Sequence, residues 1–243
     1  HLTFGIGYHE GQREYHRVRA EGGTHDVALR SAVRRTLVNT YQWHSDDQYK
    51  NRPNLVRTLV WHLEQFKDDP AETVRLANGK PATELSWRIE LPTKTRTTGE
   101  HIILCGHLDR LVIFNGDPWI LDYKTTKRTL NNEYFNNYIN DNQVSAYSYA
   151  GEVVYKTHVK GMMIDAAQIM VHNSRFMRGF AGRTAEQLAE WRDTVDWWIA
   201  FAEGCAVDGY WPMNLKACNN YGGCPFRKVC GTSPVERDSW LEG

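Results

Sequence analysis

Two stretches decide how this chain folds: Gly106-His107-Leu108-Asp109-Arg110 and Asp122-Tyr123-Lys124-Thr125-Thr126. Between them lies Asn115-Gly116-Asp117-Pro118, whose Asn-Gly pair predicts a tight turn that folds the second strand back on the first. The alternation of side chains along a strand sends Asp122 and Lys124 to the same face. The sequence therefore predicts a hairpin that places Asp109 beside Asp122, with a lysine next to them.

This hairpin has the composition of a metal site. Two carboxylates make a hard, oxygen-rich site for Mg²⁺ or Mn²⁺, and a neighbouring lysine adds what phosphodiester hydrolysis requires. The bland alternative is a charged pair that decorates a surface strand. The apolar run Trp119-Ile120-Leu121 indicates a buried strand instead, and buried charges are kept mainly when they are paired or bound to metal.

The overall composition limits which classes of protein and which partners the chain is compatible with. The chain has 243 residues, of which 41% are hydrophobic and 24% charged, as in ordinary soluble proteins. The net charge is zero, so binding to nucleic acid has to depend on a local patch. No apolar run approaches a membrane span and no signal peptide opens the chain, so we expect no membrane association. Because the first residue is His1, we expect further residues upstream.

Hydrophobic periodicity gives the coarse order of elements. The second expected helix places Val33, Leu37 and Tyr41 on one apolar stripe. The pair Thr184 and Gln187 predicts a capping box that opens a long helix ending near residue 203. The other expected elements are helices at 4–21, 26–42, 54–67 and 143–156, and strands at 84–91, 101–114, 119–124 and 161–171. This order predicts a mixed α/β core with a helical insertion.

The order of the motifs resembles that of RecB-like nucleases of the PD-(D/E)XK superfamily. The resemblance is carried by Phe4-Gly5-x-x-Tyr8-His9-Glu10, Glu84, Gly106–Arg110, Asp122–Thr126 and Gln143-x-x-x-Tyr147. It implies a restriction-endonuclease-like core, in which a central mixed β-sheet is flanked by helices. It also implies a single domain over residues 1–243, with a helical insertion at 24–80 and a cysteine-rich, metal-cluster tail at 206–243.

The resemblance implies roles for the residues of the hairpin and the first helix. Asp109 and Asp122 would ligate the divalent metal, and His9 would complete its shell. Lys124 would orient or deprotonate the attacking water and stabilise charge in the transition state. Taken alone, His9 reads more readily as a histidine on a helix surface.

Three further residues carry roles with open alternatives. Glu84 would bind the metal directly or through water, or it is a strand residue that faces solvent. Gln143 and Tyr147 share one helical face. The resemblance implies that they orient the lysine and contact DNA, although the same spacing also suits a helix that packs its tyrosine on the sheet.

The tail holds Cys218, Cys224 and Cys230 in an irregular segment. It resembles the iron–sulfur tail of CRISPR-associated, AddB-type and phage exonuclease members. A [4Fe–4S] cluster needs four ligands, and the family usually takes the fourth from upstream of the first helix. Cys205 is a weaker substitute, and Cys105 reads as a core residue on a strand. A zinc site is the competing interpretation.

The resemblance implies a Mg²⁺- or Mn²⁺-dependent deoxyribonuclease, most consistent with an exonuclease, acting on single- or double-stranded DNA. The expected setting is the cytoplasm of a bacterium or a phage-infected cell, with a protein of recombination or repair as a partner. The alternative is a catalytically idle module that binds DNA or a partner. Basic residues of the insertion would line a DNA channel or form a solvated face, and these are Arg34, Arg35, Arg52 and Arg57. Trp191 and Trp198 are expected in the core.

Overall fold

The computed structural model describes residues 2–156 and 158–241, and the chain forms two compact units. The first comprises His1–Lys94 and Glu100–Thr194, and the second Thr95–Gly99 and Val195–Gly243. Within the described residues, no helix is long and apolar enough to cross a bilayer.

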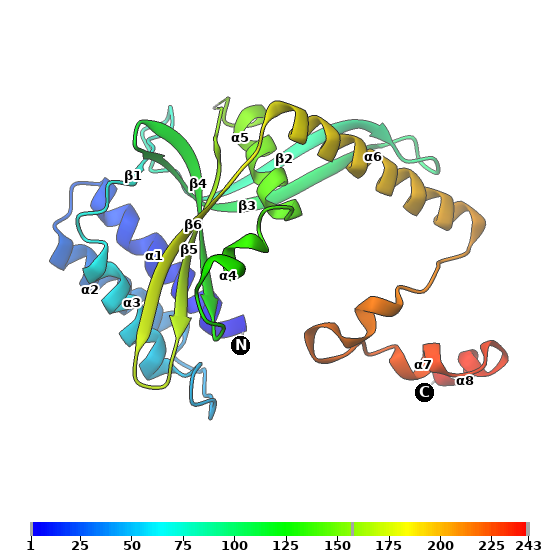
Figure 1. The fold of residues 1–243 in the computed structure, drawn as a ribbon, viewed down its shortest axis with the longest axis horizontal. Helices are drawn as coiled ribbons and strands as arrows, with labels where there is room; N and C mark the ends of the chain where they lie inside the picture. The colour runs from blue at the N-terminus through cyan, green and yellow to red at the C-terminus, as the bar shows by residue number, and fades with distance from the viewer. Residues whose placement is uncertain (1, 157, 242–243) are drawn as a thin grey trace. The chain divides into compact units, whose positions relative to one another are not determined.

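A mixed sheet forms the centre of the first unit (Figure 1). Its strands follow the order β1-β3-β4-β5-β6, and β2 also pairs with β3. The β4–β5 pair is parallel and the remaining pairs are antiparallel. The strands are β1 (Glu72–Thr73), β2 (Thr83–Lys94), β3 (His101–Phe114), β4 (Asp117–Thr126), β5 (Gly161–Ile169) and β6 (Ser174–Gly182).

The parallel pair exists because a helix connects its two strands. The chain leaves β4, passes through α4 and α5, and enters β5 in the same direction, as a crossover requires. The helices are α1 (Leu2–Ala20), α2 (His25–Asn39), α3 (Arg52–Gln65), α4 (Asn132–Asn136), α5 (Asn142–Val153) and α6 (Ala185–Asp208). The predicted α/β class with a restriction-endonuclease-like core is thus confirmed, although β6, α4 and the short β1 were not expected from the sequence.

The predicted β3–β4 hairpin is confirmed. Phe114 pairs with Asp117, so only Asn115 and Gly116 form the loop. Both have positive φ, at 51° and 84°. This is the pattern of a type I′ turn, which Asn-Gly favours because its twist matches that of the flanking strands.

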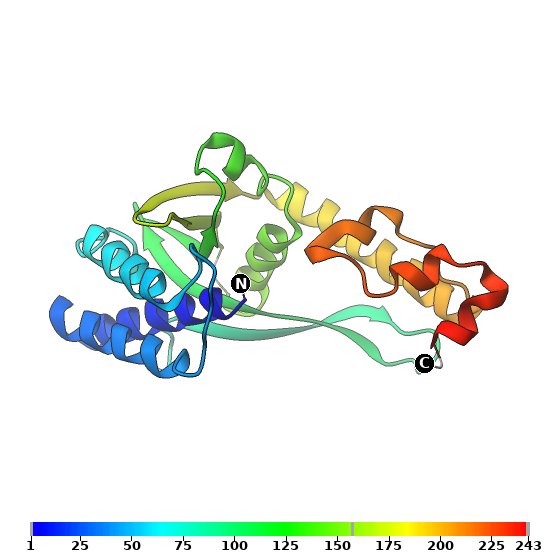
Figure 2. The ribbon, with the colours of Figure 1, turned by 90° about the horizontal axis from the view of Figure 1, so that it is seen from below.

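The main core lies between α1–α3 and one face of the sheet, and both views show these helices together (Figures 1 and 2). Two glycines of α1 allow the other helices to approach closely. A Cβ at Gly11 would lie 2.5 Å from side-chain atoms of both Thr36 and Leu59. A Cβ at Gly7 would lie 2.8 Å from Thr40. The close approach is possible only while α1 has no side chain at these two positions.

This approach determines which face of α2 is buried. Its fully buried side chains are the small ones, Ala28, Ala32 and Thr36. The larger stripe of Val33, Leu37 and Tyr41 consequently faces outward, where Leu37 is 42% and Tyr41 76% exposed. The sequence therefore identified a real apolar stripe, and the structure places it on the surface.

Two arginines of the insertion have structural roles that the sequence did not suggest. The Arg52 guanidinium donates to the carbonyls of Thr40, Tyr41 and Trp43, where the chain leaves α2. Arg57 donates to three carbonyls in the β5–β6 turn, those of Met170, Val171 and Asn173. Each arginine ties a connection to the helices, so neither is free to follow a DNA strand.

The predicted capping box at the start of α6 is confirmed. The Thr184 N–H donates to the side chain of Gln187 at 2.9 Å, and the Gln187 N–H donates to Oγ1 of Thr184 at 3.3 Å. Two expectations of burial are wrong, because Trp198 is 57% exposed and Cys105 is also exposed. Trp191 is half-buried.

The second unit holds the end of α6 and four short helices. These are η1 (Leu215–Gly222), α7 (Arg227–Gly231), η2 (Pro234–Glu236) and α8 (Arg237–Leu241). Cys205 lies near the end of α6, as the sequence predicted, and its side chain is buried.

Candidate active site

The sheet opens at the two aspartates. The β3–β4 ladder runs from Phe114–Asp117 to Arg110–Leu121 and stops one residue before Asp109 and Asp122. Beyond it, Asp109 Oδ2 accepts a 2.8 Å hydrogen bond from the backbone N–H of Tyr123. A side chain thus takes the place that a ladder carbonyl would fill, and the two carboxylates meet where the strands separate.

Lys124 is held on the same face by two partners. Its Nζ lies 2.5 Å from Oδ2 of Asp122, an ion pair, and donates to Oε1 of Gln143 at 3.0 Å. Gln143 in turn donates from Nε2 to Asp122 Oδ1 at 3.1 Å and to the Tyr147 hydroxyl at 2.8 Å. Gln143 thus contacts the lysine directly, and Tyr147 contacts Gln143.

A second group of ligand atoms gathers around Asp109. One ligand atom from each of His9, Glu84 and Asp109 lies within 4.8 Å of the other two. His9 comes from α1, and its Nδ1 is 3.2 Å from the Asp109 carboxylate. Asp122, the fourth predicted ligand, is on β4 and lies outside this set, where its carboxylate contacts Lys124 and Gln143.

Glu84 occupies an unusual backbone position. It has a φ of +51°, in the left-handed region that glutamate rarely adopts. It lies between the register pairs Thr83–Arg110 and Leu85–Leu108, on the strand next to Asp109. Such conformations persist only where the surroundings impose them and cluster at functional sites.

The charges of this site are not balanced within the protein. Burial, followed by the negative charge of Asp109, raises the pKa of Asp122 to about 6. The same two causes raise the pKa of Glu84 to about 7. Burial alone would lower the pKa of His9, but its hydrogen bond to Asp109 and the charge of that residue raise it. Crowded carboxylates that resist ionisation are the donor set that a divalent cation relieves, so these residues fit the metal.

A pocket of about 400 Å³ opens beside these ligands. One wall is apolar, with Leu2 78% and Ile6 53% exposed. The pocket gives a ligand access to His9 and Glu84, and its lining is Leu2, Gly5, Ile6, His9, Glu10 and Glu84.

A family comparison agrees with this geometry, since the family model of the PD-(D/E)XK nuclease superfamily matches residues 1–231. The chain belongs to the PD-(D/E)XK nuclease superfamily. Among curated proteins, none matched it. The match supports a metal-dependent nuclease in general, and it extends through the sheet, α5 and most of the cysteine-bearing tail.

The three tail cysteines of this PD-(D/E)XK protein, Cys218, Cys224 and Cys230, lie in the second unit. Cys218 is in η1 and Cys230 in α7, and the Cys224 N–H donates to the carbonyl of Cys218 at 3.0 Å. In the described part of the chain, the only gathered set of three ligand atoms is that of His9, Glu84 and Asp109. The three thiols are therefore near one another in the chain without forming a closed set.

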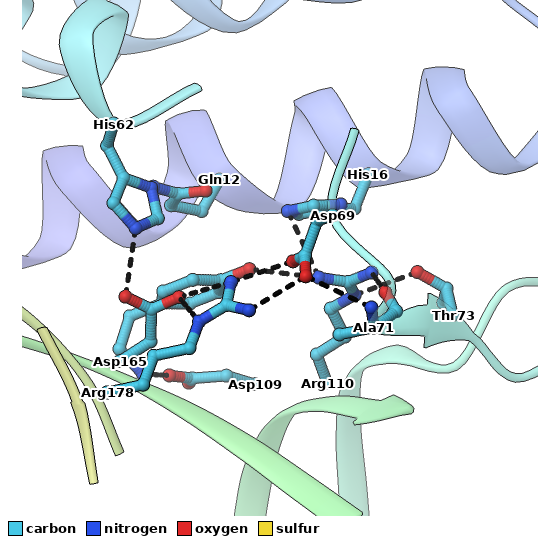
Figure 3. Close-up of polar contacts among 11 residues, drawn as sticks. Gln12, His16, His62, Asp69, Ala71, Thr73, Asp109, Arg110, Asp165 and Arg178 are labelled. Carbon is cyan, nitrogen blue, oxygen red and sulfur yellow. Dashed lines mark hydrogen bonds and ion pairs between the residues drawn. The ribbon is translucent and has the colours of Figure 1, made fainter. Parts of the chain in front are cut away.

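A buried charge network behind the PD-(D/E)XK site has no counterpart in the sequence prediction (Figure 3). Asp165, on β5, is fully buried and lies 2.9 Å from Nε2 of His62. Arg178 donates to Asp165 at 2.8 Å and binds both oxygens of Asp69 at 2.7 Å. Gln12 completes the network through a 2.6 Å hydrogen bond to His62.

This network supports the strand that carries the site. Asp165 pairs in register with Tyr123, which lies between Asp122 and Lys124. Arg110 fixes the same tyrosine from β3, since it donates to the Tyr123 hydroxyl. It also donates to Thr73 (Figure 3). No local spacing could have revealed these contacts, because His62 and Asp165 are distant in the chain.

Proposed function

We propose that this protein is a Mg²⁺- or Mn²⁺-dependent deoxyribonuclease that degrades DNA from an end. The observation that carries the proposal is the crowding of Glu84, Asp109 and Asp122 beside His9, with Lys124 fixed at their edge. A partly buried carboxylate cluster that holds one lysine next to an open pocket suits phosphodiester hydrolysis better than a passive surface.

The residues divide this chemistry between them. His9, Glu84, Asp109 and Asp122 would hold the cation, which when bound supplies Lewis acidity and a water of lowered pKa. Lys124 would orient the attacking water and stabilise negative charge on the phosphate oxygens in the transition state. Gln143 accepts from the lysine while donating to Asp122, so it keeps the ammonium group beside the carboxylate.

The second candidate is an idle module that binds DNA or a partner protein without cutting. A degenerate nuclease usually lacks an acidic ligand or the lysine. Here all four residues are present: Glu84 and Asp109 gather with His9, and Lys124 pairs with Asp122. That completeness favours a working enzyme, and a role in recombination or repair, in a bacterium or a phage-infected cell, is part of the same proposal.

The decisive experiment offers end-labelled linear DNA and covalently closed circular DNA to purified protein with Mg²⁺, Mn²⁺ or EDTA. We expect degradation of the linear DNA only, and only with metal. Lys124→Ala should abolish it, whereas Lys127→Ala, which removes an exposed lysine of the following segment, should not. Cleavage of the circle would refute the exonuclease assignment. Full activity of Lys124→Ala would refute the role of the lysine.

The cysteine-bound cluster is a separate part of the proposal. Cys218, Cys224 and Cys230 would provide three ligands of a [4Fe–4S] cluster, or of zinc, that fastens the tail. The backbone hydrogen bond between Cys224 and Cys218 supports a shared centre. Anaerobically purified protein should be brown and contain iron. A colourless preparation that contains zinc would establish the alternative and leave the nuclease proposal intact.

A further inference from the structure

A groove between α2 and α3, here called the α2–α3 groove, lies outside the site. It has a volume of about 760 Å³, and α2 forms most of its wall. Its lining is Leu29, Arg30, Val33, Arg34, Leu37, Val38, Tyr41 and Val60. None of these residues belongs to the metal site or to the buried charge network, so the proposed nuclease chemistry does not explain them.

Core packing accounts for only one end of the apolar stripe in this groove, where Leu29 packs against the core. The contact of α2 with α1 is already made by Ala28, Ala32 and Thr36, all fully buried. On the outer face, Val38 is 63% and Tyr41 76% exposed. An extended apolar surface of this kind, on a helix that already has a complete inner face, marks an interaction site.

The dimensions of the stripe suit a helix. Its part on α2, from Leu29 to Val38, spans about 14 Å at the rise of an α-helix, and Tyr41 extends it just beyond the helix end. A groove between two helices accepts the side-chain ridge of a third helix, as in helix-in-groove recognition. The complementary ligand is therefore an amphipathic helix of about three turns, with its apolar residues turned toward Leu37 and Tyr41.

The charges beside the groove indicate which charge the bound helix should have on the flanks of its apolar face. Arg30 and Arg34 are one helical turn apart, are exposed, and line the groove beside the apolar stripe. Neither guanidinium forms an ion pair with any residue that the structure describes. A second copy of this chain, seated symmetrically, would bring the same two arginines against each other, and DNA would find mostly apolar contacts.

We propose that the α2–α3 groove binds an amphipathic helix of a partner protein, with acidic residues flanking its apolar face. Acidic side chains on the partner pair with Arg30 and Arg34, while its apolar ridge covers Leu37, Val38 and Tyr41. The groove functions independently of phosphodiester cleavage. The proposal therefore also holds for a protein that binds DNA without cutting it.

The test uses two labelled helical peptides of about 18 residues, long enough to cover the stripe. Both have leucines at i, i+3, i+4 and i+7. One has glutamates on the flanks, and its twin has lysines in their place. We expect fluorescence anisotropy with the full-length protein to show binding of the acidic peptide at least about tenfold tighter than of the basic twin.

A matched pair of variants locates the site. Val38→Asp should weaken binding of the acidic peptide by about tenfold or more. It places a negative charge, of the same sign as the peptide's glutamates, in the apolar contact. Val27→Asp, on the same helix and similarly exposed at 56% but outside the groove lining, should change little. Arg30→Glu combined with Arg34→Glu should reverse the preference toward the basic peptide. Because this second change leaves the apolar stripe intact, it tests the site even if Val38→Asp does not fold.

Four outcomes would overturn the proposal. These are absence of binding, equal binding of the two peptides, an equal effect of Val27→Asp and Val38→Asp, and an unchanged preference in the double arginine variant. A dimer in light scattering that Val38→Asp dissociates would assign the groove to a second copy. A loss of DNA affinity in Val38→Asp would assign it to DNA. Nuclease activity, measured in parallel on linear DNA, should be the same for all these variants.

Discussion

Two buried aspartates on neighbouring strands have pKa values that are shifted in opposite directions. Asp122 on β4 and Asp165 on β5 are 2% and 0% exposed. Burial and Asp109 raise the pKa of Asp122, and its cationic neighbours do not compensate. Burial would also raise the pKa of Asp165, but His62 and Arg178 outweigh it and lower the pKa below its usual range. Groups within the protein thus neutralise the charge of Asp165, whereas the charge of Asp122 is left for a bound cation to neutralise.

The substitution with the largest expected effect is Asp122→Asn. It should reduce the single-turnover rate on end-labelled DNA by at least about a thousandfold, because it removes a proposed metal ligand and the anion that holds Lys124. The free energy of unfolding should stay equal or rise, since crowding with Asp109 is relieved. A rate within tenfold of the unmodified protein would show that Asp122 does not bind the metal.

Asp165→Asn should do the reverse. It leaves the Arg178 guanidinium buried with half of its former counter-charge, so we expect a loss of about 3–5 kcal/mol in the free energy of unfolding, measured in urea. The cleavage rate well below the melting temperature should change by less than about tenfold. A destabilisation under about 1 kcal/mol would mean that Asp69 alone satisfies Arg178.

The pH dependence of the two aspartates should also differ. The lowered pKa of Asp165 adds stability above the pKa of an unfolded aspartate, and that stability is lost as the pH falls through its folded value. Asp165→Asn should therefore flatten the acid limb of thermal stability against pH.

At the metal site the sign is opposite. Because the folded pKa values of Asp122 and Glu84 are raised to about 6 and 7, the stability they give is present at low pH and is lost as the pH rises through these values. Mg²⁺ should raise the melting temperature by a few degrees at pH 8 and by much less at pH 5. The Mg²⁺ shift should persist in Asp165→Asn and vanish in Asp122→Asn. An equal shift at both pH values would contradict the carboxylate origin of the effect.

The smallest effect concerns the backbone of Glu84. Glu84→Gly should stabilise the metal-free protein by about 0.5–1 kcal/mol, because glycine adopts a positive φ without strain. Asn115→Gly is the matched control, since Asn115 has the same φ of 51° in an ordinary turn that asparagine tolerates. A larger gain at Asn115 than at Glu84 would show that the site stores no strain.

The sequence predicted the hairpin and its neighbours well because their signals are local. The Asn115-Gly116 turn, the alternation around Asp122 and the four-residue spacing of Gln143 and Tyr147 each depend on a few adjacent residues. The resemblance to RecB-like nucleases then supplied His9 and Glu84, which no local pattern distinguishes from surface residues.

What the sequence did not predict depends on contacts between distant segments. The His62, Asp165 and Arg178 network joins α3, β5 and β6, and no period connects these residues. The sequence also failed to predict which face of α2 is buried, for a related reason. Small residues rarely form an apolar stripe, and their burial follows from Gly7 and Gly11 on another helix. Cys105 was misplaced because strand periodicity does not indicate which face of a strand is covered.

The ties between the helical region and the sheet limit how this protein can be shortened. Residues 24–80 supply His62 and Asp69, and Arg57 clamps the turn between β5 and β6. Deleting them would leave a buried anion and a buried cation in the remaining chain without their partners, and would uncover the aromatic side of α1. Residues 24–80 are therefore indispensable to the unit that carries the proposed metal ligands, whatever binds the outer surface of α2.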